Sequence, residues 1–153
     1  MREQLRGSVR RLRYQNDSGN AIVEFVYLAV LLMVPLVYVL LTVFRVQGAA
    51  YAVSSAAREA GRVYATSNSV DDAYERAFAA ASIVMADSGL ELSRQQLQIN
   101  CEDCLRPGSR VPVVIDYNVD LPLLPKFLDR SAPASVHVSG RHLEVVDRFR
   151  VGP

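Results

Sequence analysis

The sequence lacks a marked excess of charge of either sign, and it has few residues suited to catalysis or metal binding. Its 17 basic and 16 acidic side chains give a formal net charge of +1, so nothing points to a nucleic-acid groove or an acidic substrate. The two cysteines alone are too few for a structural zinc site, and the two histidines lie far from them in sequence. No serine elbow, phosphate-binding glycine loop or metal-hydrolase motif is present. We therefore expect no enzyme, no catalytic residue and no cofactor.

Charge is also missing from one long segment. Residues 25–44 read FVYLAVLLMVPLVYVLLTVF, and a helix of this length crosses a hydrocarbon core of roughly 30 Å. A core helix of a soluble protein is a poorer interpretation, because such helices are usually shorter and carry a polar face. Arginines crowd the preceding segment and the next one is Arg45. The positive-inside rule therefore predicts a single-pass membrane protein with a cytoplasmic N-terminus and an extracytoplasmic C-terminal domain.

The 153 residues are enough for one small domain and an anchor. We predict a basic cytoplasmic leader over residues 1–19, a long helix over 20–66 with its span at about 25–44, and an extracytoplasmic domain over 67–153. Alanine and other small residues at helical spacing extend the helix to about Ala65. Pro35 removes one backbone donor, so it should kink the helix without ending it.

The extracytoplasmic part has the pattern of an α+β fold. Ser69 with two acids after it predicts the start of a second helix that runs from about Val70 to Asp87, and Gly89 is suited to end it in a left-handed conformation. Its apolar spacing predicts a buried side of Ala73, Ala77, Ala80, Ala81 and Val84.

Beyond Gly89 the period changes to two, which predicts three antiparallel strands. Leu97, Ile99 and Cys101 alternate in the first, and residues 111–121 form a second with one wet face. Pro112 suggests an edge position or a bulge. The third strand begins near Ala134. Val136 and Val138 have one parity and Leu143 and Val145 have the other, so a bulge near Gly140 would keep both pairs on the buried face. The helix–helix–strand–strand–strand order completes the α+β prediction.

A short motif lies between the arginine-rich leader and the apolar segment. In the string GNAIVEF, Gly19 and Asn20 are followed by Glu24 and Phe25. A glycine, four residues, a glutamate and an aromatic residue before an apolar helix resemble the class III signal of type IV pilins and of the pseudopilins of tight-adherence (Tad) systems. The resemblance implies that a membrane-embedded prepilin peptidase cuts between Gly19 and Asn20.

The resemblance covers most of the chain. The proline in the apolar helix, the string AAREAGRVYA and the late Asp147-Arg148-Phe149-Arg150 are similar to TadE-like proteins, particularly those of actinobacteria. Phe25 stands where the major Tad pilin usually has tyrosine, which implies a minor pilin with a pilin-like fold. The implied partners are the prepilin peptidase, other Tad pilins, the pilus assembly platform and the membrane, with no nucleic acid. The implied location is the cell membrane or a surface pilus.

Glu24 is costly near the cytoplasmic end of a spanning helix, by up to roughly 3 kcal/mol at the bilayer centre and less toward the interface. Cleavage after Gly19 creates a partner for it, the amine of Asn20, on the same chain or on a neighbour. A position in the headgroup zone, without any partner, is the alternative.

Cys101 and Cys104 are the only cysteine pair. The residues after them read as a turn, and a redox site needs a helix there, so a local disulfide is favoured outside the membrane. It would contribute roughly 2 kcal/mol. The acids Asp71, Asp72, Glu102, Asp103, Asp116 and Asp120 lack the regular spacing of a calcium loop. We therefore expect no metal site, and we expect His137 and His142 on the sheet surface.

Two other interpretations remain open. One is an unprocessed single-pass membrane protein whose external domain binds a ligand or a surface. The other is a secreted protein cut near Gly48 by ordinary signal peptidase. The mature N-terminus distinguishes all three: Asn20 for the pilin, Met1 or close to it for the unprocessed protein, and a residue near Tyr51 for the secreted one.

Overall fold

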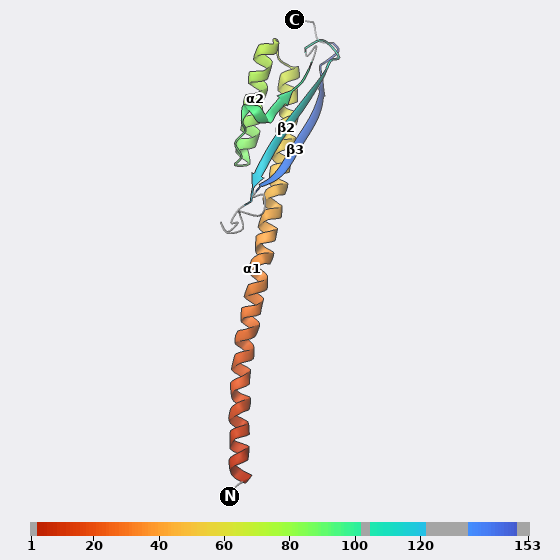
Figure 1. The fold of residues 1–153 in the computed structure, drawn as a ribbon. Helices are drawn as coiled ribbons and strands as arrows, with labels where there is room; N and C mark the ends of the chain where they lie inside the picture. The colour runs from red at the N-terminus through yellow and green to blue at the C-terminus, as the bar shows by residue number, and fades with distance from the viewer. Residues whose placement is uncertain (1–2, 102–104, 122–134, 150–153) are drawn as a thin grey trace. The chain divides into compact units, whose positions relative to one another are not determined.

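A computed structural model describes residues 3–101, 105–121 and 135–149 (Figure 1). Along the chain lie helix α1 (Glu3–Ala65), helix α2 (Val70–Asp87), the short 3₁₀ helix η1 (Arg94–Gln96), and strands β1 (Leu97–Ile99), β2 (Arg110–Asp120) and β3 (Ser135–Val145). The three strands form one antiparallel sheet in the order β1-β2-β3. The protein therefore belongs to the α+β class, as predicted. The chain divides into two compact units, residues 1–41 and 42–153.

Helix α1 is the longest element and contributes to both units. It begins at Glu3, so most of the basic leader is helical, and it ends at Ala65, where the small-residue pattern predicted its end. The helix continues through Pro35 without ending there. A kink at this proline stays a prediction.

Helix α2 follows after a short break, and both of its ends were predicted correctly. The hydroxyl of Ser69 accepts a hydrogen bond from the backbone N–H of Asp72, which satisfies one of the free donors of the first turn. Gly89 has a φ of 70°, and its N–H donates to the carbonyl of Ala86. This left-handed residue ends the helix and turns the chain toward η1.

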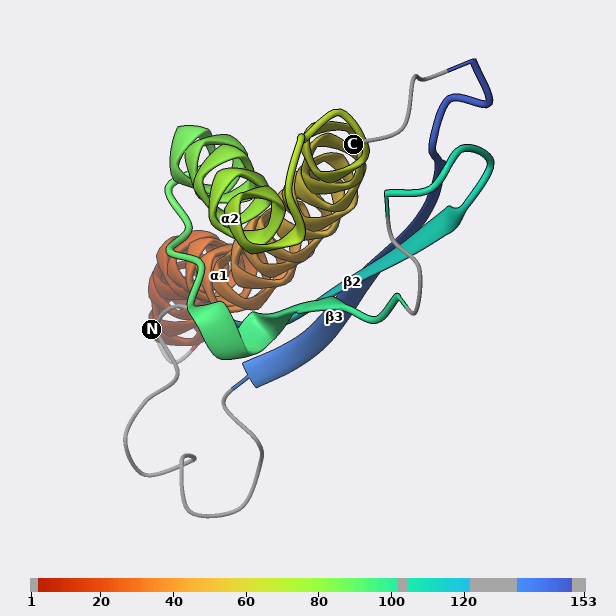
Figure 2. The ribbon, with the colours of Figure 1, turned by 90° about the horizontal axis from the view of Figure 1, so that it is seen from above.

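The core of the second unit lies between the sheet and the two helices (Figure 2). Helix α1 presents small residues to it, α2 presents Ala73, Ala77, Ala81 and Met85, and β2 presents every second residue. Met85 was missing from the predicted buried side of α2, whereas Ala80 and Val84 are only half-buried. The core residues of α1 are Ala49, Ala52, Val53, Ala56, Ala57, Ala60, Tyr64 and Ala65.

Two glycines mark where α1 and the sheet approach most closely. A Cβ placed on Gly140 of β3 would lie 2.7 Å from the backbone oxygen of Val53. A Cβ on Gly61 of α1 would lie 3.1 Å from the Cδ2 atom of His142. Because glycine has no side chain, the backbones of helix and strand come into near contact at Gly140.

The bulge predicted near Gly140 is wrong. Strand β3 pairs with β2 without interruption, from Arg110 opposite Val145 to Asp120 opposite Ser135. Continuous pairing gives β3 a single parity, so Leu143 and Val145 lie exposed on the outer face of the sheet.

His142 was also predicted wrongly as a surface residue. It is half-buried on the helix side, and its Nε2 atom lies 2.9 Å from Oε2 of Glu144. Because Gly140 must face α1, the side chains two and four residues further along β3 face α1 as well.

Two smaller corrections concern β1 and β2. Strand β2 is the central strand, yet Pro112 lies in it opposite Leu143. Strand β1 reaches only as far as the pair of Ile99 with Val113, so on that side Pro112 lies beyond the end of β1. The proline therefore has the local edge that its missing N–H requires, without a bulge. Cys101, predicted to alternate within β1, follows the end of the strand.

Candidate functional site

The residues of the predicted processing motif belong to α1. Gly19 and Asn20 are helical. Further along, the side chains of Glu24 and Phe25 are exposed, and 73% of the Phe25 side chain is accessible. Among the described residues no side chain pairs with the carboxylate of Glu24. If Glu24 lies in a membrane and is paired there, its partner comes from outside the described residues.

The apolar segment that follows is exposed at all but one of its large side chains in the first unit. The exposed large hydrophobic side chains between Ile22 and Leu41 have accessible fractions between 45% and 73%, and Tyr38 is half-buried. The helix is long and apolar enough to cross a membrane, and the most apolar part of it is not buried by any other described part of the chain. Leaving so much apolar surface in water is unfavourable by about 25 cal/mol per Å². The segment is therefore compatible with the anchor of a single-pass membrane protein.

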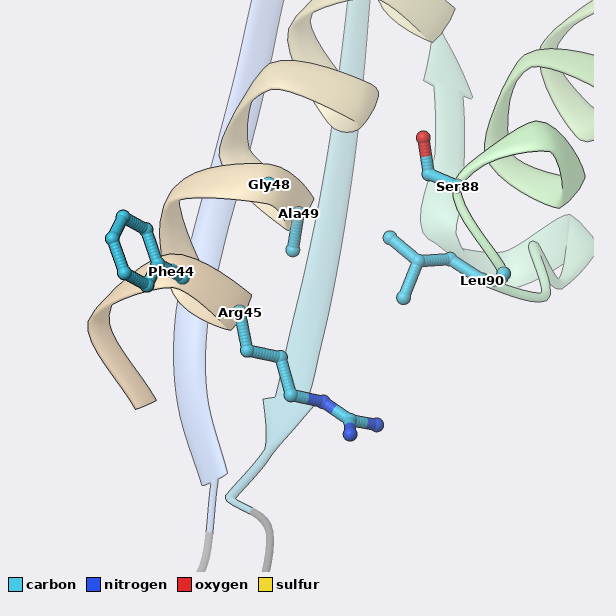
Figure 3. Close-up of a pocket in the computed structure, with 7 residues that line it drawn as sticks. Phe44, Arg45, Gly48, Ala49, Ser88 and Leu90 are labelled. Carbon is cyan, nitrogen blue, oxygen red and sulfur yellow. The ribbon is translucent and has the colours of Figure 1, made fainter. Parts of the chain in front are cut away.

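A pocket lies in the second unit, beside the part of α1 where the apolar residues 25–44 end (Figure 3). It has a volume of about 350 Å³ and lies between the start of this part of α1 and the segment that follows α2. In Figure 3 the side chain of Arg45 extends away from α1 and ends below Leu90, whereas the side chain of Leu90 points toward α1. The pocket is lined by Phe44, Arg45, Gly48, Ala49, Ser88, Gly89 and Leu90.

The position of the chain after Gly89 is set by contacts between η1 and α2. The guanidinium of Arg94 donates to both carboxylate oxygens of Glu75, at 2.5 and 2.9 Å, and lies 4.9 Å from the ring centre of Phe78. The hydroxyl of Tyr74 donates to the backbone oxygen of Arg94 at 3.2 Å. The Arg94 hydrogen bond lowers the pKa of Glu75 below its ordinary value. Both charged groups are exposed, so this pair positions η1 more than it stabilises the fold.

The predicted disulfide is only partly within the described residues. Cys101 is half-buried, packs against the core and is not a free thiol. Cys104 lies outside the described residues, so its pairing with Cys101 stays a prediction.

The acids considered above as calcium ligands lie on different elements of the described structure. Asp71 and Asp72 lie in the first turn of α2, whereas Asp116 and Asp120 lie on β2. Glu102 and Asp103 are outside the described residues. In the described part of the chain no group of three or more His, Cys, Asp or Glu side chains could hold a metal ion.

Asp116 does form a small polar cluster on the outer face of the sheet. His137 lies with Nε2 3.4 Å from a carboxylate oxygen of Asp116 and with Nδ1 3.1 Å from the amide oxygen of Asn118. The imidazole is exposed, as predicted for this histidine.

Comparisons of the chain with family models, with curated proteins and with solved structures give no match.

The pocket was not predicted from the sequence. Its parts come from α1 and from the turn after α2, about 40 residues apart, so no local pattern joins them. One residue gives a local indication. Gly48 interrupts a helical pattern that otherwise favours alanine, and glycine in a helix interior is unfavourable by about 0.5–1 kcal/mol.

Proposed function

We propose that this chain is a TadE-like minor pilin of a tight-adherence pilus system. It is made as a precursor, is cut by prepilin peptidase between Gly19 and Asn20, and remains in the cell membrane through the apolar part of α1. Its domain of residues 67–153 is extracytoplasmic. In the assembled state the anchor packs beside the helices of other Tad pilins on the assembly platform or in the pilus.

The observation that carries this proposal is the exposed apolar part of α1 directly after the processing motif. The described residues of the chain bury none of its most apolar stretch. A membrane covers such a surface, and so do the helices of neighbouring pilins. The function we propose needs both environments, because a pilin is stored in the membrane and then packs into a filament.

Glu24 fits the same mechanism. Its carboxylate is exposed and has no partner among the described residues. Removal of residues 1–19 exposes the amine of Asn20, which supplies a positive charge four residues away or on an adjacent subunit. The proposed mechanism is lateral association of helices. The ion pair between Glu24 and Asn20 supports this association in surroundings where water competes weakly. No catalytic step by this chain is involved.

The mature N-terminus tests the proposal. The full chain is expressed in a strain with an active prepilin peptidase, extracted from the membrane and measured by intact mass spectrometry. We expect a chain of residues 20–153, and we expect Gly19→Ala to slow or abolish its formation. Gly48→Ala is a matched control with the same chemical change in the same helix, and it should be processed like the wild type.

Two results would contradict the proposal. Full-length chain alone, in a strain where a known prepilin is cut, would favour the unprocessed membrane protein with a ligand- or surface-binding domain. An N-terminus near Tyr51 would favour a secreted protein released by signal peptidase.

A further inference from the structure

The pocket between α1 and the end of α2 begins where the apolar segment ends. Phe44 is the last residue of that segment, and Arg45 and Ala49 line the pocket. At 1.5 Å per residue, these positions lie within about 8 Å of Phe44 along the helix. The polar headgroup layer adds roughly 5–7 Å to each side of the hydrocarbon core. If α1 spans the membrane, the pocket opens at the depth of the phospholipid headgroups.

Arg45 supplies the positive charge of the pocket. Among the described residues its guanidinium has no hydrogen-bond or ion-pair partner. By contrast, Arg58 and Arg62, further along α1, bond to side chains of their own helix. Guanidinium groups bind phosphate oxygens in a bidentate geometry, and such bonds are about twice as strong as neutral ones. Arg45 is therefore available to a phosphate group that enters the pocket.

The opposite wall of the pocket lies at the C-terminal end of α2 and has no charged side chain among its lining residues. Ser88 and Gly89 follow the last turn of α2, where the helix dipole places a partial negative charge. Asp87, the last residue of α2, is exposed and precedes this wall directly. A group with a second negative charge would be repelled here, whereas a primary ammonium would be attracted.

Gly48 keeps the pocket open. A Cβ added at Gly48 would meet no atom within 4 Å, so this glycine does not serve close packing of helix and sheet as Gly140 does. It is unfavourable in a helix interior, and the space beside it is part of the pocket. A volume of about 350 Å³ lies at the lower end of the range for small-molecule sites.

From these four observations we propose that the pocket binds the headgroup of a zwitterionic phospholipid that carries a phosphate and a primary ammonium, as phosphatidylethanolamine does. The phosphate pairs with Arg45, and the ammonium lies toward Ser88 and Gly89 at the end of α2. The acyl chains run beside Phe44. The proposal depends on the membrane anchoring of α1 and not on pilus assembly.

Native mass spectrometry of the full chain in a mild detergent tests this site. The protein is titrated with phosphatidylethanolamine, and in parallel with phosphatidylglycerol of the same acyl chains. We expect one phosphatidylethanolamine to be retained, and we expect about tenfold or greater loss of retention in Arg45→Gln. Gly48→Leu should cause a similar loss, because leucine favours the helix and its side chain fills the pocket. Arg58→Gln, which removes an arginine elsewhere on α1, should retain the lipid like the wild type.

Three results would overturn the proposal. Equal retention in the wild type, Arg45→Gln and Gly48→Leu would mean that the lipid binds elsewhere. Equal retention of phosphatidylglycerol would contradict the role assigned to the end of α2. Displacement of the lipid by inorganic phosphate in excess would identify a phosphate site instead of a lipid site. All of these experiments measure lipid bound to the purified chain. A negative result would therefore contradict the lipid site without affecting the test of processing at Gly19.

Discussion

Replacing Gly140 by alanine tests the closest contact between α1 and the sheet. The new Cβ would lie 2.7 Å from the backbone oxygen and 2.8 Å from the Cγ1 atom of Val53. Ordinary van der Waals contact begins near 3.4 Å, so helix and strand must separate by roughly 0.7 Å. The obstacle includes backbone, which cannot move aside as a flexible side chain does.

The expected cost follows from this geometry. Overpacking of a close contact is unfavourable by about 1–3 kcal/mol. Because Gly140 has no positive φ, alanine can adopt its backbone conformation. Alanine also lowers the conformational entropy of the unfolded chain, which stabilises the folded protein by about 0.4–1 kcal/mol. The net destabilisation is therefore about 1–2 kcal/mol, which corresponds to roughly 5 °C or more in the unfolding temperature of a domain of this size.

Thermal unfolding of the full chain in detergent, followed by the near-ultraviolet signal of its tyrosines, measures this change. Gly48→Ala is the matched control, since it adds the same methyl group where no atom lies within 4 Å. It should stabilise the helix by about 0.5–1 kcal/mol. If Gly140→Ala unfolds at or above the wild-type temperature, α1 does not contact β3 as described.

Three further predictions concern charge and redox state. Glu24→Gln should leave cleavage and membrane insertion intact, but the Asn20 amine would then lack its ion-pair partner. Less processed protein should therefore be found in sheared pilus fractions, and incorporation at the wild-type level would refute an assembly role for Glu24. Cys101 and Cys104 should resist alkylation until reductant is added, and free thiols without reductant would contradict the disulfide. Arg94 lowers the pKa of Glu75, so the pair contributes stability above the ordinary glutamate pKa and loses it as pH falls through the lowered value. Glu75→Gln should therefore be less stable than the wild type at neutral pH, with a difference that vanishes in acid; a difference independent of pH would contradict this.

Elements with local causes could be predicted from the sequence. Helix α2 begins and ends where a capping serine and a left-handed glycine place its ends, and both act within one turn of the chain. The wet and dry faces of β2 follow from strict alternation over 11 residues, four of them fully buried on the dry face. The absence of charge over residues 25–44 likewise determines that this helix needs an apolar environment.

Tertiary structure alone decided which way β3 faces. Its sequence has apolar residues of both parities, so alternation does not distinguish the two faces. The predicted bulge, which would have placed both sets of apolar residues on the buried face, is absent. The decision comes from Gly140, because only a residue without a side chain can meet the backbone of Val53. That contact turns His142 and Glu144 toward α1 and leaves Leu143 outside. The pocket beside Gly48 depends on tertiary structure for the same reason: its walls come from two segments that only folding brings together.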